Sequence, residues 1–167
     1  MIRPRPVPPA PDQESVWEYP RPPRVEADER RVRIVCGGLT VVDTTGALRV
    51  LETSHPPGWY VPVVALRGAG LRPTQHATWC EFKGHASYYD IVDDDGAVLA
   101  ANAAWAYPRP SAGYEALADK FSVYPARVDR CLVDDREVRS QAGGFYGGWI
   151  TDDVVGPFKG EYGTIGW

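Results

Sequence analysis

The chain has 167 residues, of which 44% are hydrophobic and 24% charged, and its formal net charge is −4. This length and composition predict one domain with one core, and the acidic balance argues against binding nucleic acid by neutralising phosphates. No apolar run reaches the length of a membrane span, and residues 1–5 lack the apolar stretch of a secretory signal. We therefore expect a cytoplasmic protein with a small-molecule partner, and neither nucleic acid nor membrane as a partner.

Proline dominates the beginning of the chain, where eight of the 16 prolines fall within residues 1–23. Because proline lacks an amide donor and favours extended polyproline conformation, we expect residues 1–28 to form an arm laid on the domain surface. Trp17 and Tyr19 are suited to fixing this arm in place. We further expect a β domain over 29–140 and a glycine- and aromatic-rich extension over 141–167 that packs on it.

Alternating apolar residues predict antiparallel strands along the rest of the chain. Val32, Ile34 and Cys36 share one face of a strand, and the glycine pair at 37–38 predicts a hairpin with residues 39–42. Further strands are predicted at 47–52, 86–92, 97–107, 127–133 and 137–139, with turns at 93–96 and 134–135 and an irregular stretch between 57 and 86. Helical spacing after Ser111 predicts one short helix over 111–120. The expected fold class is mainly β, with antiparallel sheets and hairpins and one short helix.

The cysteines and histidines show no recognisable metal-binding pattern. The three cysteines are an odd number without a Cys-x-x-Cys pair, so we expect reduced thiols rather than disulfides or a four-cysteine zinc site. The three histidines lack regular ligand spacing, and the acidic run at 93–96 lacks the spaced ligands of a calcium loop. We therefore expect no metal and no cofactor.

A polar cluster follows the strand at 47–52 and precedes two adjacent prolines. In a functional interpretation, Glu52 orients His55, which acts as a general acid or base, while Arg49 binds an anionic group. In the alternative interpretation these side chains form a hydrogen-bonded turn, because a spacing of three along an extended segment does not by itself place Glu52 beside His55.

A second cluster precedes the glycine turn at Gly84. Cys80 is either a nucleophilic thiol activated by a nearby cation or a small buried hydrophobe. Lys83 is either a cation that binds a ligand or a catalytic group. Aromatic residues on neighbouring strands either fill the core or line an apolar cleft beside Lys83 and His55. These aromatic residues are Trp59, Tyr60, Tyr88, Tyr89, Trp105 and Tyr107.

Several motifs occur in order over residues 30–135, among them Glu52-Thr53-Ser54-His55-Pro56-Pro57, Cys80-Glu81-Phe82-Lys83-Gly84 and Phe121-x-x-Tyr124-Pro125. This ordered set resembles domain-of-unknown-function family 427. The resemblance implies a β-tent-like fold, similar to methionine sulfoxide reductase B and the drug-binding domain of cereblon, without the zinc-binding cysteine pairs of that wider group. The family is also described as nucleotidyltransferase-like, but that chemistry needs paired carboxylates for magnesium, whereas the acidic residues at 93–95 lie in a turn. The matching motif positions, which form the candidate site, are Arg49, Glu52, His55, Tyr60, Cys80, Lys83, Tyr88, Tyr89, Trp105 and Tyr107.

Three functional hypotheses remain open from the sequence. The first is a small-molecule-binding domain whose cleft is lined by the aromatic residues and polarised by Arg49, Glu52, His55 and Lys83. The second is an enzyme on the same cleft, with His55 and Glu52 in acid-base roles and Cys80 or Lys83 as nucleophile or anion stabiliser. The third is a non-enzymatic interaction module that docks a partner, or a second copy of itself as a homodimer, through its arm and tail.

Overall fold

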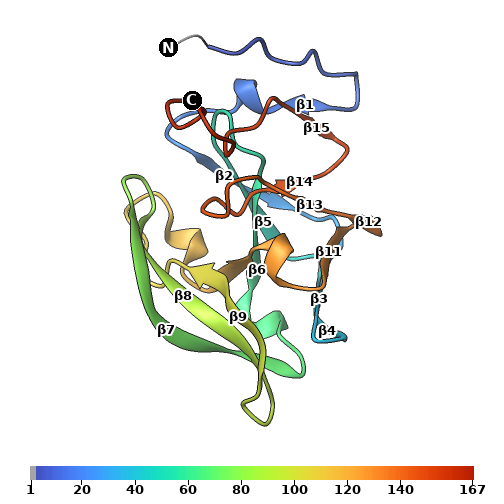
Figure 1. Cartoon of the computed structure of the whole chain (residues 1–167), viewed down its shortest axis with the longest axis vertical. Helices are drawn as coiled ribbons and strands as arrows, with labels where there is room; N and C mark the ends of the chain where they lie inside the picture. The colour runs from blue at the N-terminus through green and yellow to red at the C-terminus, as the bar shows by residue number, and fades with distance from the viewer. Residues whose placement is uncertain (1–2) are drawn as a thin grey trace.

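The computed structural model describes residues 3–167, which are built mainly of β-strands with short connections (Figure 1). The largest sheet has seven strands in the order β2-β5-β6-β10-β9-β8-β7, and each strand is antiparallel to its neighbours. In this spatial order the strands are β2 (Arg24–Asp28), β5 (Ala47–Leu51), β6 (Gly58–Pro62), β10 (Lys120–Val123), β9 (Val98–Ala106), β8 (Gly84–Asp93) and β7 (Ala69–Cys80). The prediction of a mainly β fold with antiparallel sheets is therefore confirmed.

A second sheet of four antiparallel strands packs beside the first and closes the main core. Its strands, in spatial order, are β12 (Arg136–Glu137), β11 (Arg130–Val133), β3 (Val32–Cys36) and β4 (Leu39–Thr44). Val32 and Ile34 of this sheet lie in the same buried cluster as Trp59 and Phe121 of the large sheet. Trp149, from the C-terminal part of the chain, stacks on Trp59 with ring centroids 6.1 Å apart.

The large sheet buries apolar side chains on both faces, because successive residues of a strand point to opposite sides. On β6, Trp59 and Val61 belong to the main core, whereas Tyr60 belongs to a second cluster on the other face. On β9, Ala104 belongs to the main core and Trp105 to the second cluster. The second cluster is rich in tyrosine and also contains Val50, Tyr88, Tyr107, Tyr114, Leu117 and Tyr124.

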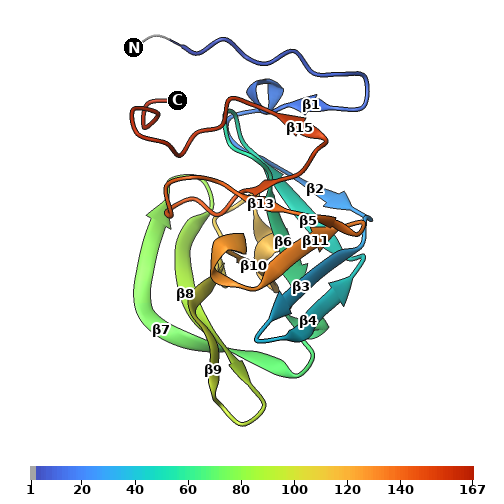
Figure 2. The same cartoon turned by 45° about the vertical axis from the view of Figure 1, so that its right-hand side comes forward.

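The N-terminal arm, from residue 3 onwards, and the C-terminal segment lie side by side at one end of the molecule (Figures 1 and 2). Strand β1 (Glu14–Ser15) pairs in parallel with β15 (Val154–Val155), and β13 (Arg139–Ser140) pairs with β14 (Trp149–Ile150). Val16 is fully buried in a third cluster together with Tyr19, Leu51 and Val154. The arm and the C-terminal segment are therefore packed against each other and against β5.

Several elements differ from the sequence-based expectations. The three predicted hairpins are confirmed as β3-β4, β8-β9 and β11-β12. In place of a helix over 111–120 the chain forms a single 3-10 turn, because Gly113 has φ +94 and Lys120 already pairs with Pro62 in the sheet. The stretch that was expected to be irregular contains β6 and β7.

The helical elements are all short 3-10 turns, namely η1 (Val16–Glu18), η2 (Val63–Ala65), η3 (Glu115–Leu117) and η4 (Pro125–Arg127). No helix among residues 3–167 is long and apolar enough to cross a membrane.

Candidate functional site

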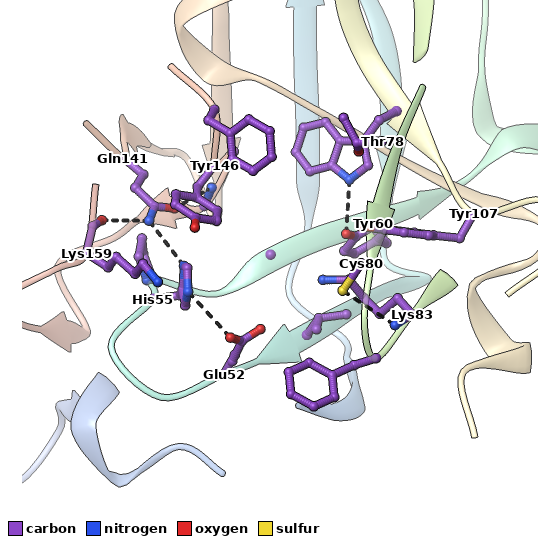
Figure 3. Close-up of a pocket in the computed structure, with 18 of the residues that line it drawn as sticks. Glu52, His55, Tyr60, Thr78, Cys80, Lys83, Tyr107, Gln141, Tyr146 and Lys159 are labelled. Carbon is purple, nitrogen blue, oxygen red and sulfur yellow. Dashed lines mark hydrogen bonds and ion pairs between the residues drawn. The ribbon is translucent and has the colours of Figure 1, made fainter. Parts of the chain in front are cut away.

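A cavity of about 490 Å³ opens beside the second, tyrosine-rich cluster of buried side chains. Its residues come from strands β5 to β9 and the segments that follow β5, β7, β9 and β10, from Arg21, and from the C-terminal segment. Figure 3 shows Glu52 and His55 on one side with Gln141, Tyr146 and Lys159, and Tyr60, Cys80, Lys83 and Tyr107 on the other side. The volume lies within the range of about 300–1,000 Å³ that is typical of ligand pockets.

Aromatic rings on alternate positions of neighbouring strands form one wall of the cavity. Tyr88 and Trp105 are paired across β8 and β9, and Tyr60 meets Trp105 edge-on with centroids 6.1 Å apart. The indole Nε1 of Trp105 donates a hydrogen bond of 3.1 Å to the Tyr60 hydroxyl. Burial raises the pKa values of Tyr60 and Tyr107, so both phenols are neutral near pH 7 and keep their protons for donation.

His55 is held by contacts at both ring nitrogens. Its Nε2 lies 3.5 Å from Oε2 of Glu52, and its Nδ1 lies 3.3 Å from Nε2 of Gln141. The Gln141 amide is itself fixed, because its Nε2 donates to the Lys159 carbonyl at 2.6 Å and its Oε1 accepts from the Gly148 amide at 3.0 Å. Gln141 can therefore only donate to Nδ1, which assigns the proton of the neutral ring to Nε2, facing Glu52.

The surroundings of His55 disfavour its charged form. Burial, followed by the positive charges of Lys159, Lys83 and Arg21, lowers the pKa of His55 to about 3. The ring is consequently neutral at pH 7, so its 3.5 Å contact with Glu52 is not an ion pair. Glu52 instead pairs with Arg21 of the arm at 3.2 Å.

The turn between β7 and β8 brings Lys83 and Cys80 into the cavity. Gly84 has φ +100, and a Cβ there would meet the Ser111 hydroxyl at 2.9 Å, so the turn is suited to glycine. The Lys83 amide donates to Sγ of Cys80 at 3.5 Å, and the Lys83 carbonyl accepts from the Ser111 amide at 2.9 Å. These contacts fix the backbone of the turn and direct the lysine side chain over the Tyr107 ring, with Nζ 5.4 Å from its centroid.

Lys83 carries an ammonium group that no carboxylate neutralises directly. Within residues 3–167 no carboxylate oxygen lies within 4.0 Å of its Nζ. Burial opposes the charge, yet the acidic groups of Tyr60, Cys80 and Glu52 around it hold the pKa of Lys83 above its ordinary value. The cavity therefore contains a charged ammonium beside aromatic rings and phenolic hydroxyls.

The C-terminal segment supplies the opposite wall, and two glycines allow its close approach. A Cβ on Gly147 would overlap the six-membered ring of Trp105, and one on Gly148 would lie 2.6 Å from Oε1 of Gln141. This close approach seats Tyr146 against His55, with ring centroids 4.7 Å apart.

Eight of the eleven site residues predicted from the sequence line this cavity, and three do not. Trp59 and Tyr89 project from the opposite face of the sheet to Tyr60 and Tyr88, and they pack in or against the main core. Arg49 also lies outside the cavity and pairs with Glu14, Glu26 and Asp28. The eight that line it are Glu52, His55, Tyr60, Cys80, Lys83, Tyr88, Trp105 and Tyr107.

The lining residues outside the β domain were not among the site residues predicted from the sequence. Among these are Arg21 in the arm and Gln141, Tyr146 and Lys159 in the C-terminal segment. In the sequence, the glycines next to aromatic residues in that segment could have indicated that it lines the cavity, because glycines let a backbone approach an aromatic ring closely. Within residues 3–167 no group of three or more His, Cys, Asp or Glu side chains is arranged to hold a metal ion, and the three cysteines are free.

Comparison with protein families gives one finding. A family model described as a domain of unknown function (DUF427) matches residues 24–134. No curated protein matches the chain. The matched region contains all eight predicted residues that line the cavity, whereas Arg21 and the wall formed by Gln141, Tyr146 and Lys159 lie outside it.

Proposed function

The chain belongs to the DUF427 family, and from that starting point we propose that its cavity is a binding site for a small organic anion with an aromatic or apolar body. The observation that carries this proposal is the ammonium of Lys83, which lies among neutral aromatic side chains with no carboxylate within 4.0 Å in residues 3–167. Lys83 is only half-buried, and an anionic ligand would give its ammonium the charge-assisted partner that residues 3–167 do not provide.

The polar groups around Lys83 suit a carboxylate or a phosphate. The Tyr60 hydroxyl accepts from the Trp105 indole at 3.1 Å, which leaves its own proton free to donate to a ligand. The Tyr107 ring lies beside the same ammonium. An anion placed there would receive a charge-assisted hydrogen bond from Lys83 and a further bond from Tyr60.

Binding fits the geometry better than acid-base catalysis at His55. Its Nδ1 accepts from Gln141, and its Nε2 carries the proton that faces Glu52. Neither nitrogen is free to take a proton from a ligand, and a pKa of about 3 makes the ring a weak base at pH 7. In this proposal His55 is a neutral wall of the cavity.

Calorimetric titration with 4-alkoxybenzoates tests the proposal. We expect the wild type to bind the benzoate but not the matching benzamide, because only the carboxylate can pair with Lys83. Lys83→Met should reduce benzoate affinity by about 10–100-fold, as loss of a charge-assisted hydrogen bond implies. Lys120→Met is the control, since Lys120 pairs with Asp119 outside the cavity. Equal binding of benzoate and benzamide, or an unchanged affinity in Lys83→Met, would contradict the proposal.

A second candidate function is thiol chemistry at Cys80. The Sγ of Cys80 accepts a hydrogen bond from the Lys83 amide at 3.5 Å and lines the cavity beside the Lys83 side chain, a partly exposed position next to a cation of the kind in which reactive cysteines occur. If this chemistry operates, iodoacetamide should label Cys80 in the folded protein faster than in urea, and Lys83→Met should slow the labelling. A rate no higher than that of the denatured protein would exclude the nucleophile.

A further inference from the structure

A second cavity of about 350 Å³ lies between the arm and the end of the C-terminal segment. It shares Arg21 and Trp167 with the first cavity, so the two cavities are neighbours. The other residues that line it are Arg3, Pro4, Trp17, Thr53 and Gly166.

The side chains of the second cavity are cationic and aromatic. Its lining contains two arginines and two tryptophans and no acidic residue. The guanidinium of Arg3 lies 5.3 Å from the centre of the Trp17 ring, and Trp17 meets Trp167 edge-on at 5.5 Å. Within residues 3–167 no carboxylate oxygen lies within 4.0 Å of the Arg3 side-chain nitrogens. An exposed planar cation above an indole is a suitable receptor for a carboxylate or phosphate.

Arg21 connects the second cavity to the first. Its Nη2 lies 3.2 Å from Oε2 of Glu52 and donates to the Thr53 carbonyl at 2.8 Å. This guanidinium is therefore already engaged by a carboxylate and a carbonyl, which leaves Arg3 as the cation that is available to a ligand in the second cavity. In the first cavity, Lys159 already donates to the Trp167 carbonyl oxygen at 3.2 Å. Within residues 3–167, the lining cations whose charged groups have no oxygen partner are thus Lys83 in the first cavity and Arg3 in the second.

We infer that the two cavities are subsites for one elongated ligand with two anionic groups, one bound by Lys83 and the other by Arg3. This inference rests on the proposed function of the first cavity and adds the class of ligand. The aromatic or apolar body of the ligand lies against the tyrosine-rich wall, and a chain passes Arg21 and Trp167 to a terminal carboxylate or phosphate beside Trp17.

A series of 4-(ω-carboxyalkoxy)benzoates with alkyl linkers of increasing length provides the probes. Each diacid is compared with its ω-methyl ester, which keeps the benzoate and the linker but has no second charge. Titration calorimetry is performed on the full-length wild type and on Arg3→Met, Arg5→Met and Lys83→Met. Arg5 is the matched control, because it is an exposed arginine of the same arm that lines neither cavity.

For one range of linker lengths we expect the diacid to bind at least about tenfold more tightly than its ester to the wild type and to Arg5→Met. Arg3→Met should abolish this difference while leaving the affinity of the ester unchanged, and Lys83→Met should weaken both probes. The inference would be overturned, while the proposed function stands, if no diacid binds more tightly than its ester at any linker length. It would also be overturned if the higher affinity of the diacid persists in Arg3→Met. Failure of the esters themselves to bind in a Lys83-dependent way would instead overturn the proposed function.

Discussion

At the scale of single residues, His55 shows how neighbours set the chemistry of a side chain. Gln141 donates to Nδ1, and the cations Lys159, Lys83 and Arg21 oppose a proton on the ring, in addition to the effect of burial. The family motif contains Glu52 and His55, but the residue that orients the ring lies outside the matched region. The role of His55 therefore depends on a contact between residues 86 positions apart in the sequence.

The lowered pKa of His55 predicts a pH dependence of the free energy of unfolding. The unfolded chain binds a proton at the ordinary value of 6.5, whereas the folded protein binds it only at about 3. Stability is therefore full above about pH 6.5 and falls as the pH drops towards 3, by at most about 1.4 kcal/mol per pH unit. His55→Gln should lose this slope in urea unfolding between about pH 6.5 and pH 5, above the range in which most carboxylates titrate.

His85→Gln serves as the control for that measurement, because His85 is exposed. This variant should keep the slope of the wild type. A wild-type stability that is flat over this interval would show that His55 titrates normally in the folded protein.

Arg49 and Lys83 are two cations with opposite expected roles. Arg49 is buried and pairs with Glu14, Glu26 and Asp28. Arg49→Met removes the cation that Glu14 shares with Glu26 and Asp28, of which the last two keep Arg24 and Arg30 as partners, so we expect a loss of about 1–3 kcal/mol in urea unfolding. The affinity of the folded variant for alkoxybenzoate should stay unchanged, whereas Lys83→Met should lose affinity with little loss of stability. A marked loss of benzoate affinity in folded Arg49→Met would instead place Arg49 in ligand binding.

At the scale of elements, the alternation of side chains along a strand explains which predicted site residues meet. The sequence contains the adjacent pairs Trp59-Tyr60 and Tyr88-Tyr89, and the aromatic cleft was expected to include both members of each pair. In a strand only one member can face a given side, and it is Tyr60 and Tyr88 that face the cavity. The residue types alone were enough to identify the aromatic candidates. Which of them face the cavity depends on how whole strands pair in the sheet.

Local patterns located the hairpins, because their partners are close in sequence and joined by glycine or aspartate turns. They did not locate β7, whose apolar alternation is weak and which contains Pro73. This strand is at the edge of the sheet and is paired only with β8, where a residue without an amide donor is tolerated. No strand was predicted at β10, which overlaps the predicted helix only at Lys120, because its partners, β6 and β9, are distant in sequence.

The glycine pair of the C-terminal segment gives a prediction at the same scale. A methyl group at Gly147 would overlap the Trp105 ring, so Gly147→Ala must displace either the indole or the segment. We expect a destabilisation of about 1–3 kcal/mol, as in other overpacked sites, and weaker binding of alkoxybenzoate. Gly70→Ala is the control, because a Cβ there meets nothing within 4 Å. Equal stability and equal affinity of the two variants would show that the segment does not press on Trp105.

At the scale of the whole molecule, the arm and the C-terminal segment form one layer that completes the cavity. Arg30 pairs with Asp28 of β2 and with Asp153 beside β15, which joins the large sheet to the tail. The Glu14 amide donates to the Asp153 carbonyl at 2.7 Å. Because the arm and the tail pack against each other in this way, they leave less exposed surface for docking a separate partner. This weakens the hypothesis of an interaction module.

Backbone hydrogen bonds at Ser54 connect the arm to the cavity. Val16 is fully buried, and its carbonyl accepts from the Ser54 amide at 3.0 Å, while the Ser54 carbonyl accepts from the Lys159 amide at 2.8 Å. The arm, the turn that carries His55 and the tail are thus linked through Ser54. Val16→Ala should cost about 2 kcal/mol and speed amide hydrogen exchange in 14–19, 53–55 and 154–160, with slower exchange retained in β8 and β9.

The same variant should weaken alkoxybenzoate binding, because Lys159 and the turn at Glu52 and His55 line the cavity. Val64→Ala is the matched control, since the Val64 side chain is 82% exposed and far less of its surface is lost on truncation. Faster exchange confined to 14–19 would show that the arm folds onto the domain without supporting the cavity. Faster exchange throughout the large sheet would show instead that the arm is part of one cooperative unit with the core, so that the cavity could not loosen without global unfolding.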